Sequence, residues 1–511
     1  MKAVNIVRER GNTVKYISTR GNYKKVKSSE AIQLGMVPEG GLFIPEEVPT
    51  FLEIDIRNMQ KKDYREIAFM ILKRFLTDYD PDELKEMIYA TYNEENFGSE
   101  EVTPLVKLNE NTFILELWHG PTAAFKDMAL QLMPRLLVKA REMLEVEEDI
   151  VILVATSGDT GTAALEGFKN IDGIKIIVFY PKDGVSKIQE KQMLTVEGEN
   201  VEVVGVKGNF DDCQTAVKNA FADSELNNYL KKNGYSFSSA NSINWGRLVP
   251  QIIYYFATYA DLLKNEEINF GEKINICVPT GNFGNILAGY YAFRMGLPVN
   301  KFICASNENK VLTDFLRTGV YDINRNFKKT ISPSMDILIS SNLERFLYEM
   351  NGNDSAKIIK WYESLKEEGK FSIDEETRNK INNLFTGKYA SEKETKKTIK
   401  TTFEKFNYIV DPHTAVGVNA FEKYSKRADD NLITVINSTA SPYKFGRAVL
   451  KALKGKVIAE DEFDILEEIK TVTGEDIHRA LVGLKEKENI HTRRCSKDEV
   501  KNEVKDILNL D

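Results

Sequence analysis

From about residue 98 onward, short apolar runs alternate with segments of helical periodicity, and this alternation limits the possible folds more than any other feature. The apolar runs are 150–155, 174–180, 201–206, 274–278, 302–305 and 433–436. Helical spacing follows from Gly161, at 186–196, after Asp211 as the expected cap, at 286–295 and from about Tyr443. Strands separated by helices pair in parallel and are covered on both faces. The sequence therefore predicts an α/β fold with doubly wound, mainly parallel sheets.

The segment before residue 98 has a different pattern. It contains a strand at 14–18, a short helix after Ser28-Ser29 that ends at Gly35, and a tight loop at 38–45. Two helices follow near 62–77 and 81–93, the second with Asp80 as its cap and Pro81 at its first position. We expect residues 1–97 to form a small, separate N-terminal α+β lobe.

Charged residues dominate 343–407, where Lys and Glu recur at helical spacing with both signs interleaved. This pattern is typical of solvated helices and not of a binding patch. We therefore expect an α/β core over 98–342, an inserted helical segment over 343–407, a return to the core over 408–455 and a helical tail over 456–511.

Composition excludes several classes of protein. The net charge of −8 is spread over 511 residues without a basic stripe, so no nucleic-acid partner is expected. The four cysteines lie far apart, so neither a zinc site nor a disulfide framework is expected. The first residues, Met1–Arg8, soon become charged, and no apolar run approaches the length of a membrane span. We expect a cytoplasmic protein without a metal or a membrane partner.

One lysine is placed for covalent chemistry. The stretch 119–129 follows the apolar run 113–117, and apolar residues then recur at helical spacing to residue 140, so Lys126 is expected in the first turn of a helix. The helix dipole would favour the neutral amine, which can attack an aldehyde. The alternative is an ordinary lysine that extends along an amphipathic helix to solvent.

Three loops follow strands at the edge where α/β sheets bind ligands. The loop 156–162 is either an anion site at a helix start or a turn capped by its own hydroxyls. The loop 280–285 has the glycines that let a backbone approach a phosphate, but it lacks both nucleotide fingerprints, so it favours a single phosphate or a glycine turn without ligand. In 437–442, a hydroxyl can bind a ring nitrogen or cap the next helix.

A fourth polar segment, 238–247, contains Asn241 and Arg247. Arginine suits phosphate recognition, although an arginine near Trp245 is as often part of a surface stacking pair. A lysine at a helix start, a loop for one phosphate, an anion loop and a hydroxyl for a ring nitrogen are together the components of a pyridoxal phosphate site.

The sequence resembles the threonine synthases, in particular their longer microbial and fungal branch. The motifs that carry the resemblance are Glu30-Ala31-Ile32, 40–45, His119-Gly120-Pro121-Thr122, Phe125-Lys126-Asp127, 155–161, Asn241-Ser242-Ile243-Asn244, Gly281-Asn282-Phe283-Gly284 and Asp411-Pro412-His413. The resemblance implies a tryptophan-synthase-like, fold type II pyridoxal phosphate enzyme. Such an enzyme converts O-phospho-L-homoserine and water into L-threonine and phosphate, and we expect a monomer or homodimer.

The resemblance also implies roles for individual residues. Lys126 would hold the cofactor as an internal aldimine and then move protons at the α and β carbons of the substrate. The cofactor phosphate would bind the backbone of Gly281, Asn282, Phe283, Gly284 and Asn285, while Thr439 would face the pyridine nitrogen and Asp159 the ring oxygen. Ser157 and Thr160 would hold the substrate carboxylate, and Asn241 and Arg247 its phosphate.

The sequence departs from the family pattern in two places and leaves rival functions open. Many relatives of this fold have asparagine at the position of Asp159, so the protonation state of that contact is open, and Ser441 stands where the branch often has histidine. His413 is either a packed or capping histidine or a proton carrier. A serine or threonine dehydratase, or a phospho-lyase that releases 2-oxobutyrate, would share Lys126. A non-catalytic metabolite-binding protein is the alternative from another class.

Overall fold

Two mainly parallel sheets form the framework of the computed structural model, which describes residues 13–428 and 431–510. The six-stranded sheet has the order β13 (Phe385–Tyr389), β10 (Val299–Ser306), β9 (Ile274–Pro279), β14 (Thr434–Ser438), β4 (Thr112–Glu116) and β3 (Leu105–Asn109). The five-stranded sheet has the order β15 (Arg493–Ser496), β7 (Val201–Lys207), β6 (Ile174–Pro181), β5 (Asp149–Ala155) and β8 (Tyr235–Ser238). Only the pair β3–β4 is antiparallel in these two sheets. The predicted α/β class with mainly parallel sheets is confirmed.

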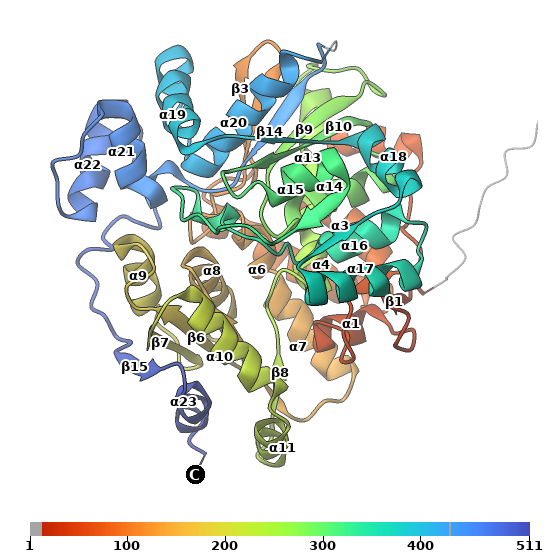
Figure 1. Ribbon diagram of the computed structural model, residues 1–511, viewed down its shortest axis with the longest axis vertical. Helices are drawn as coiled ribbons and strands as arrows, with labels where there is room; N and C mark the ends of the chain where they lie inside the picture. The colour runs from red at the N-terminus through yellow and green to blue at the C-terminus, as the bar shows by residue number, and fades with distance from the viewer. Residues whose placement is uncertain (1–12, 429–430, 511) are drawn as a thin grey trace, which may run out of the picture.

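Helices cover both faces of each sheet (Figure 1). In the smaller sheet, Val151 and Leu153 of β5 pack with α10 (Phe210–Ala222) and α23 (Val500–Ile507). The alternate residues Ile150 and Ile152 belong to the main core, which includes α7 (Met133–Met143) and α8 (Asp159–Phe168). In the larger sheet, α20 (Pro412–Ser425) covers one face, and α13 (Ile253–Lys264) and α14 (Gly284–Arg294) lie on the other.

The remaining elements complete these layers. They are β1 (Tyr16–Ser18), α1 (Ser28–Leu34), β2 (Phe43–Pro45), α2 (Glu53–Asn58), η1 (Met59–Lys61), α3 (Tyr64–Phe75), α4 (Pro81–Thr91), α5 (Glu94–Phe97), α6 (Asp127–Leu130), α9 (Lys187–Leu194), α11 (Ser224–Lys232), α12 (Trp245–Leu248), η2 (Val249–Ile252), α15 (Val311–Thr318), β11 (Val320–Asp322), η3 (Pro333–Met335), α16 (Leu343–Met350), α17 (Ser355–Glu368), β12 (Lys370–Ser372), α18 (Glu375–Leu384), α19 (Glu392–Phe406), η4 (Pro442–Phe445), α21 (Gly446–Lys454) and α22 (Glu462–Thr473).

Most predicted elements of the N-terminal segment are present, while Met1–Arg8 lie outside the described residues. Asp80 caps α4 through the backbone amides of residues 82 and 83, and Gly35 ends α1 with a φ of +72°. The segment does not have a core of its own, because its apolar residues join the main core: the rings of Tyr16 and Trp245 lie 5.3 Å apart. The prediction that Asp211 caps α10 is wrong, since Asn209 accepts the hydrogen bond from the Asp212 amide.

The charged segments contain strands as well as helices. In 343–407, β13 pairs in parallel with β10, and β12 pairs with β11. In the tail, β15 pairs in parallel with β7. Both segments contain helices, and these additional strands were not expected from the sequence. These short edge strands bury only a few side chains, such as Phe385 and Cys495, so they have no apolar run that sequence patterns detect.

The helix expected after Lys126 is split into α6 and α7. Pro134 lies at the start of α7 and has no N–H to donate to the carbonyl of Leu130, so the helical hydrogen-bond ladder is interrupted there. The Leu130 carbonyl instead lies against Gly167 of α8, where an alanine Cβ would be 2.0 Å from its oxygen. This contact places α6, and with it Lys126, against the helix that begins at Asp159.

We expect Gly167→Ala to lower the free energy of unfolding by at least about 1–3 kcal/mol, because the added methyl overlaps a backbone carbonyl that cannot rotate away. A urea titration followed by circular dichroism measures the change. Gly446→Ala in α21 is the matched control, since its nearest atoms are the ends of side chains at 3.2–3.3 Å. Equal effects of the two substitutions would contradict this interpretation.

Candidate active site

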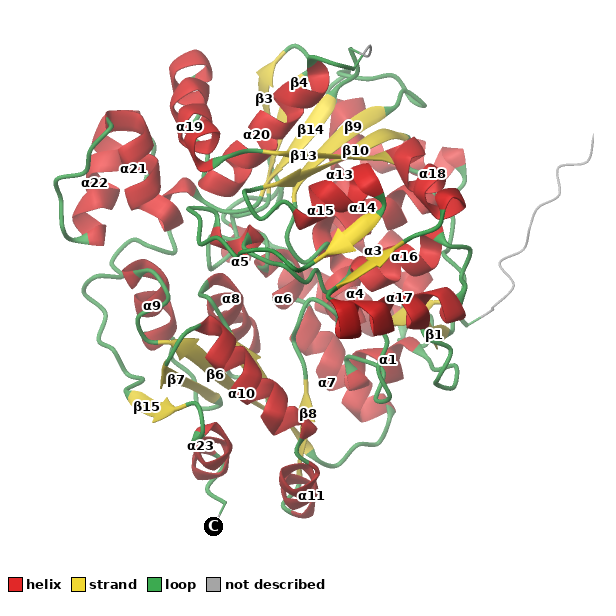
Figure 2. Cartoon of the chain, viewed as in Figure 1, coloured by secondary structure: helices red, strands yellow, loops and turns green. Residues whose placement is uncertain are grey.

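The site lies where the carboxyl ends of strands from both sheets meet. Figure 2 shows loops between the two sheets, and hydrogen bonds join those after β4 and β14. The Phe125 amide donates to the Thr439 carbonyl at 2.9 Å, and the Ser441 amide donates to the Ala123 carbonyl at 3.0 Å. The loop after β5 joins them through Asp159. The fold thus brings together two of the three loops singled out in the sequence with the segment of Lys126, and the loop after β9 adjoins them through Asn285.

Lys126 is a buried lysine, with 9% of its surface exposed, so the alternative of a solvent-reaching lysine is wrong. Its Nζ lies 3.4 Å from Asp159 Oδ2. Burial lowers the pKa of Lys126, the carboxylate of Asp159 opposes this change, and the cations of Lys444 and Arg247 add to it. The expected cause, a helix dipole, does not apply because α6 has only four residues.

Asp159 contacts groups from four parts of the chain. Its Oδ1 accepts from Lys444 Nζ at 2.8 Å and from Gln189 Nε2 at 2.9 Å. Its Oδ2 faces Lys126 and the hydroxyl of Ser334, each at 3.4 Å. Burial raises the pKa of Asp159, but the ammonium groups of Lys444 and Lys126 and these hydrogen bonds hold it well below its usual range. The protonation state that the sequence leaves open is therefore that of a carboxylate.

The loop after β5 leaves two hydroxyls available. Thr156 Oγ1 accepts from the amides of Gly158 and Gly161, both at 2.9 Å, so this residue stabilises the turn. Ser157 is exposed and Thr160 is partly exposed, and neither side chain hydrogen-bonds another residue in the described part of the chain. The two interpretations of the loop thus apply to different residues: Thr156 caps, while Ser157 and Thr160 can hold an anion.

The loop after β9 leads into α14 without a side-chain cap. Phe283 adopts a left-handed conformation with φ of +63°, and the amides of the first helical turn have no intrahelical acceptor. Gly281 is required because a Cβ there would be 2.5 Å from the carbonyl oxygen of Ser334. These free amides suit a phosphate group.

Asn285 adds a donor without a partner to this loop. Its Oδ1 accepts from Asn437 Nδ2 at 3.0 Å and from the Tyr255 hydroxyl, whereas its buried Nδ2 has no hydrogen-bond partner among the residues that the structure describes. A buried unsatisfied amide is costly, so this geometry indicates an acceptor supplied by a ligand.

The loop after β14 presents Thr439, which is buried and whose hydroxyl forms no hydrogen bond with the residues that the structure describes. Ser441 caps η4 instead. His413 is buried nearby: its Nδ1 lies 2.6 Å from Asp411 Oδ2, and its Nε2 accepts from the Ser334 amide at 3.1 Å. Both ring nitrogens are engaged, as in a packed histidine.

Arg247 is a buried cation without a carboxylate partner in the described ranges 13–428 and 431–510. Its Nη1 donates to the Ala240 carbonyl at 2.8 Å, and only 6% of its surface is exposed. Burial lowers its pKa to about 10, so the guanidinium stays charged at neutral pH. A buried, unpaired cation indicates an anionic ligand. The expected stacking partner of Trp245 is Arg345, not Arg247.

Asn241, at the start of the same segment, is exposed and its side chain has no hydrogen bond to another described residue. Asn244 has a structural role, because its Oδ1 caps α12 through the Gly246 amide at 2.8 Å.

Sequence reasoning missed Lys444, Gln189 and Ser334, which lie outside any motif. Only the position of Lys444, close behind the loop 437–442, could have suggested it.

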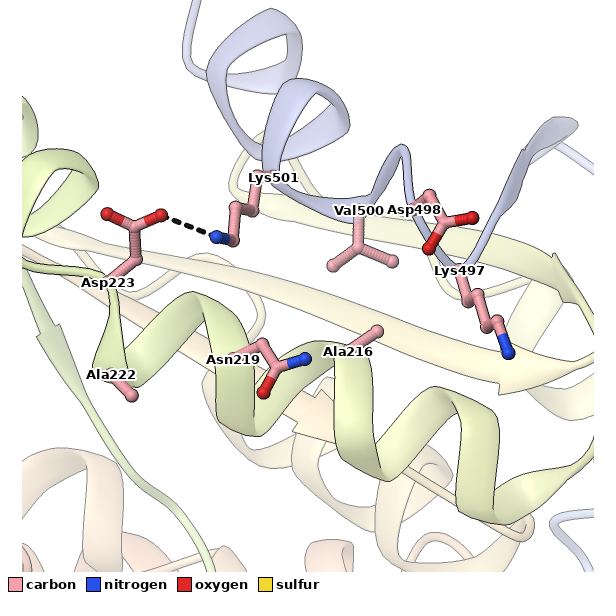
Figure 3. Close-up of a pocket in the computed structure, with 8 residues that line it drawn as sticks. All are labelled: Ala216, Asn219, Ala222, Asp223, Lys497, Asp498, Val500 and Lys501. Atoms are coloured by element: carbon pink, nitrogen blue, oxygen red, sulfur yellow. Dashed lines mark hydrogen bonds and ion pairs between the residues drawn. The ribbon is translucent and has the colours of Figure 1, made fainter.

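A surface groove elsewhere on the protein does not resemble this site. Figure 3 shows this groove, of about 450 Å³, between α10 and α23. Its lysines already pair with carboxylates, Lys501 with Asp223 and Lys497 with Asp212. Among the described residues, no group of three His, Cys, Asp or Glu could hold a metal ion, and no helix has the length and apolarity needed to cross a bilayer.

Three family models match the chain. One described as Threonine synthase N terminus matches residues 15–92, one described as Pyridoxal-phosphate dependent enzyme matches 97–439, and one described as Threonine synthase, C-terminal matches 414–500.

Curated relatives and solved structures agree with these matches. The chain is 40% identical to Threonine synthase of Saccharomyces cerevisiae, over 90% of this chain and 93% of that protein. It is also 40% identical to Threonine synthase-like 1 of Homo sapiens, over 92% of this chain but only 64% of the length of that longer protein.

Two crystal structures cover 97% of this chain and 99% of their own at 36% identity. They are threonine synthase from yeast, with a TM-score of 0.87, and PLP-bound threonine synthase from Brucella melitensis, with a TM-score of 0.86. The chain therefore belongs to the threonine synthase family of pyridoxal-phosphate-dependent enzymes.

Proposed function

We propose that the protein is a threonine synthase, which converts O-phospho-L-homoserine and water into L-threonine and phosphate with pyridoxal 5′-phosphate as cofactor. The observation that carries the proposal is the pair of buried cations in one site. Lys126 has a lowered pKa, as a nucleophilic amine requires, and it lies within electrostatic reach of Arg247, an unpaired guanidinium that suits a phosphorylated substrate. A cytoplasmic location and a monomeric or homodimeric assembly without nucleic acid complete the proposal.

The residues present fit the cofactor. Lys126 would hold it covalently, the amides of 281–285 and the free Nδ2 of Asn285 suit its phosphate, and the free hydroxyl of Thr439 suits its ring nitrogen. Asp159, a carboxylate beside Lys126, would lie at its ring oxygen. When bound, pyridoxal phosphate supplies an electron sink that stabilises negative charge on the carbons of the substrate.

The protein side chains have three tasks in this reaction. Ser157 and Thr160 would hold the substrate carboxylate through their free hydroxyls, and Asn241 and Arg247 would hold the phosphate until it leaves. Lys126 would accept and return protons at the α and β carbons, which requires an amine that is neutral near pH 7. Burial of Lys126 is the main cause of that lowered pKa.

A dehydratase or a phospho-lyase that releases 2-oxobutyrate would use the same Lys126, so the product decides between these functions. With O-phospho-L-homoserine, we expect equal amounts of phosphate and L-threonine, measured together by a phosphate assay and amino-acid chromatography. Release of phosphate with 2-oxobutyrate and without threonine would identify a phospho-lyase instead.

We expect Lys126→Ala to lower turnover by roughly 10³-fold or more, since it removes both the covalent attachment and the acid–base group. Borohydride reduction followed by peptide mass mapping should place the pyridoxyl label on Lys126 in the unaltered protein and nowhere in the variant. Lys139→Ala, on the solvent side of α7, is the control and should change neither result. A label on any other residue would refute the proposed site.

We expect Arg247→Ala to raise KM for phosphohomoserine about 10- to 100-fold, because a hydrogen bond to a charged group contributes roughly 1.5–3 kcal/mol. The Kd of the cofactor, followed by absorbance titration, should change little. Arg141→Ala, whose guanidinium pairs with Asp149 at 2.9 Å, is the matched control. An equal loss of cofactor and substrate binding would show that Arg247 does not bind the substrate phosphate.

A further inference from the structure

Lys444 is a second buried lysine in the site, and the proposed reaction does not use it. Its side chain is fully buried in η4. Its Nζ lies 2.8 Å from Asp159 Oδ1 and donates to the Thr122 carbonyl at 2.8 Å. Lysines are almost never fully buried unless they are paired, so the contact with Asp159 is what stabilises the ammonium of Lys444.

Two lysines therefore share one carboxylate, and the contacts are unequal. Lys444 is closer to Asp159, and the Thr122 carbonyl satisfies a second of its protons. Lys126 makes one longer contact of 3.4 Å with the other oxygen. A single negative charge neutralises one ammonium, and the shorter contact with the extra acceptor favours the charge on Lys444.

The other charged groups around Lys126 do not change this balance. Arg247 of α12 is a cation and disfavours a second one. Asp127 of α6 is bound through both carboxyl oxygens by the amide and hydroxyl of Thr122, and it forms no ion pair with Lys126 in the described part of the chain. His413 of α20 is engaged by Asp411, and burial lowers the pKa of His478, near Lys444, to about 3, so that ring is neutral.

We propose that Lys444 is a positioning residue: it neutralises and orients the Asp159 carboxylate, so that Lys126 beside it remains an uncharged amine. The contacts described above support this distribution of charge, whereas its importance for catalysis rests on the proposed function. Without Lys444, the charge of the Asp159 carboxylate would have no close cation other than Lys126, 3.4 Å away, and would hold that lysine as an ammonium.

The test measures the pKa of Lys126 directly, in the full-length chain freed of cofactor. Trace labelling with acetic anhydride over a range of pH, followed by peptide mass spectrometry, gives the titration of each lysine against the exposed Lys232 as internal reference. Five proteins are compared: the unaltered chain, Lys444→Met, Lys444→Arg, Asp159→Asn and the double variant of Lys444→Met with Asp159→Asn. A change in overall fold is detected by circular dichroism.

The charges of Lys444 and Asp159 predict how the pKa of Lys126 differs among these proteins. Lys444→Met should raise it by at least about one unit, which is a tenfold lower labelling rate at neutral pH. Asp159→Asn should lower it, because Lys444 then acts on Lys126 unopposed. The double variant should return near the unaltered chain, since both charges are gone, and Lys444→Arg should also leave the titration near the original.

A role in folding alone would not produce these differences. The inference is overturned if Lys444→Met folds and its Lys126 has the same pKa as in the unaltered chain. If that variant does not fold, Asp159→Asn and the double variant still decide, because removal of Lys444 must again raise the pKa of Lys126. Labelling does not depend on turnover, so failure to form threonine would refute the proposed function and leave this distribution of charge intact.

Discussion

The ion pair between Asp159 and Lys444 determines how the two halves of the protein meet. Asp159 begins the helix that follows β5 of the five-stranded sheet, and Lys444 follows β14 of the six-stranded sheet. Gln189 and Ser334 bring two further segments to the same carboxylate. Breaking a buried pair by removal of one partner costs about 3–5 kcal/mol, so this contact fixes the position of Lys126 between the sheets.

A second buried cation ties the N-terminal segment to the site. Arg345 donates through Nε to the Phe43 carbonyl at 2.8 Å, through Nη1 to Asn342 Oδ1 at 2.7 Å, and through Nη2 to the Ile243 carbonyl. Asn342 in turn donates to the carbonyls of Ser242 and Asn282, both at 3.0 Å. The loop proposed for the cofactor phosphate and the segment proposed for the substrate phosphate are thus supported by one guanidinium, which carbonyl and amide oxygens satisfy without a carboxylate.

Sequence patterns predicted the parts of the fold that bury long apolar runs, such as β5 and β6, because strands covered on both faces are apolar throughout. They did not predict β13 and β15, which bury few side chains and depend on a neighbouring strand for their conformation. The loops of the candidate site were also predictable, because each of them directly follows an apolar run that predicts a strand. The role of Lys444 was not, because Lys451 and Lys454 follow at helical spacing and only the position of Lys444 close behind the loop 437–442 separates it from these exposed neighbours.

Pro134 changes the cause of the lowered pKa of Lys126 but not its direction. It divides the helix that the sequence predicts, so no long dipole acts on Lys126, yet burial lowers the pKa in the same direction.

The pairing of β7 with β15 has a consequence for synthesis of the chain. Glu202 of β7 and Arg493 of β15 contact each other and are 291 residues apart in the sequence. At 5–20 residues per second, a ribosome takes about 15–60 s to make the intervening chain. During that time the edge of β7, rich in valine, has no partner strand, and such edges invite association between chains. The edge of β7 therefore stays available to other strands until β15 emerges and pairs with it.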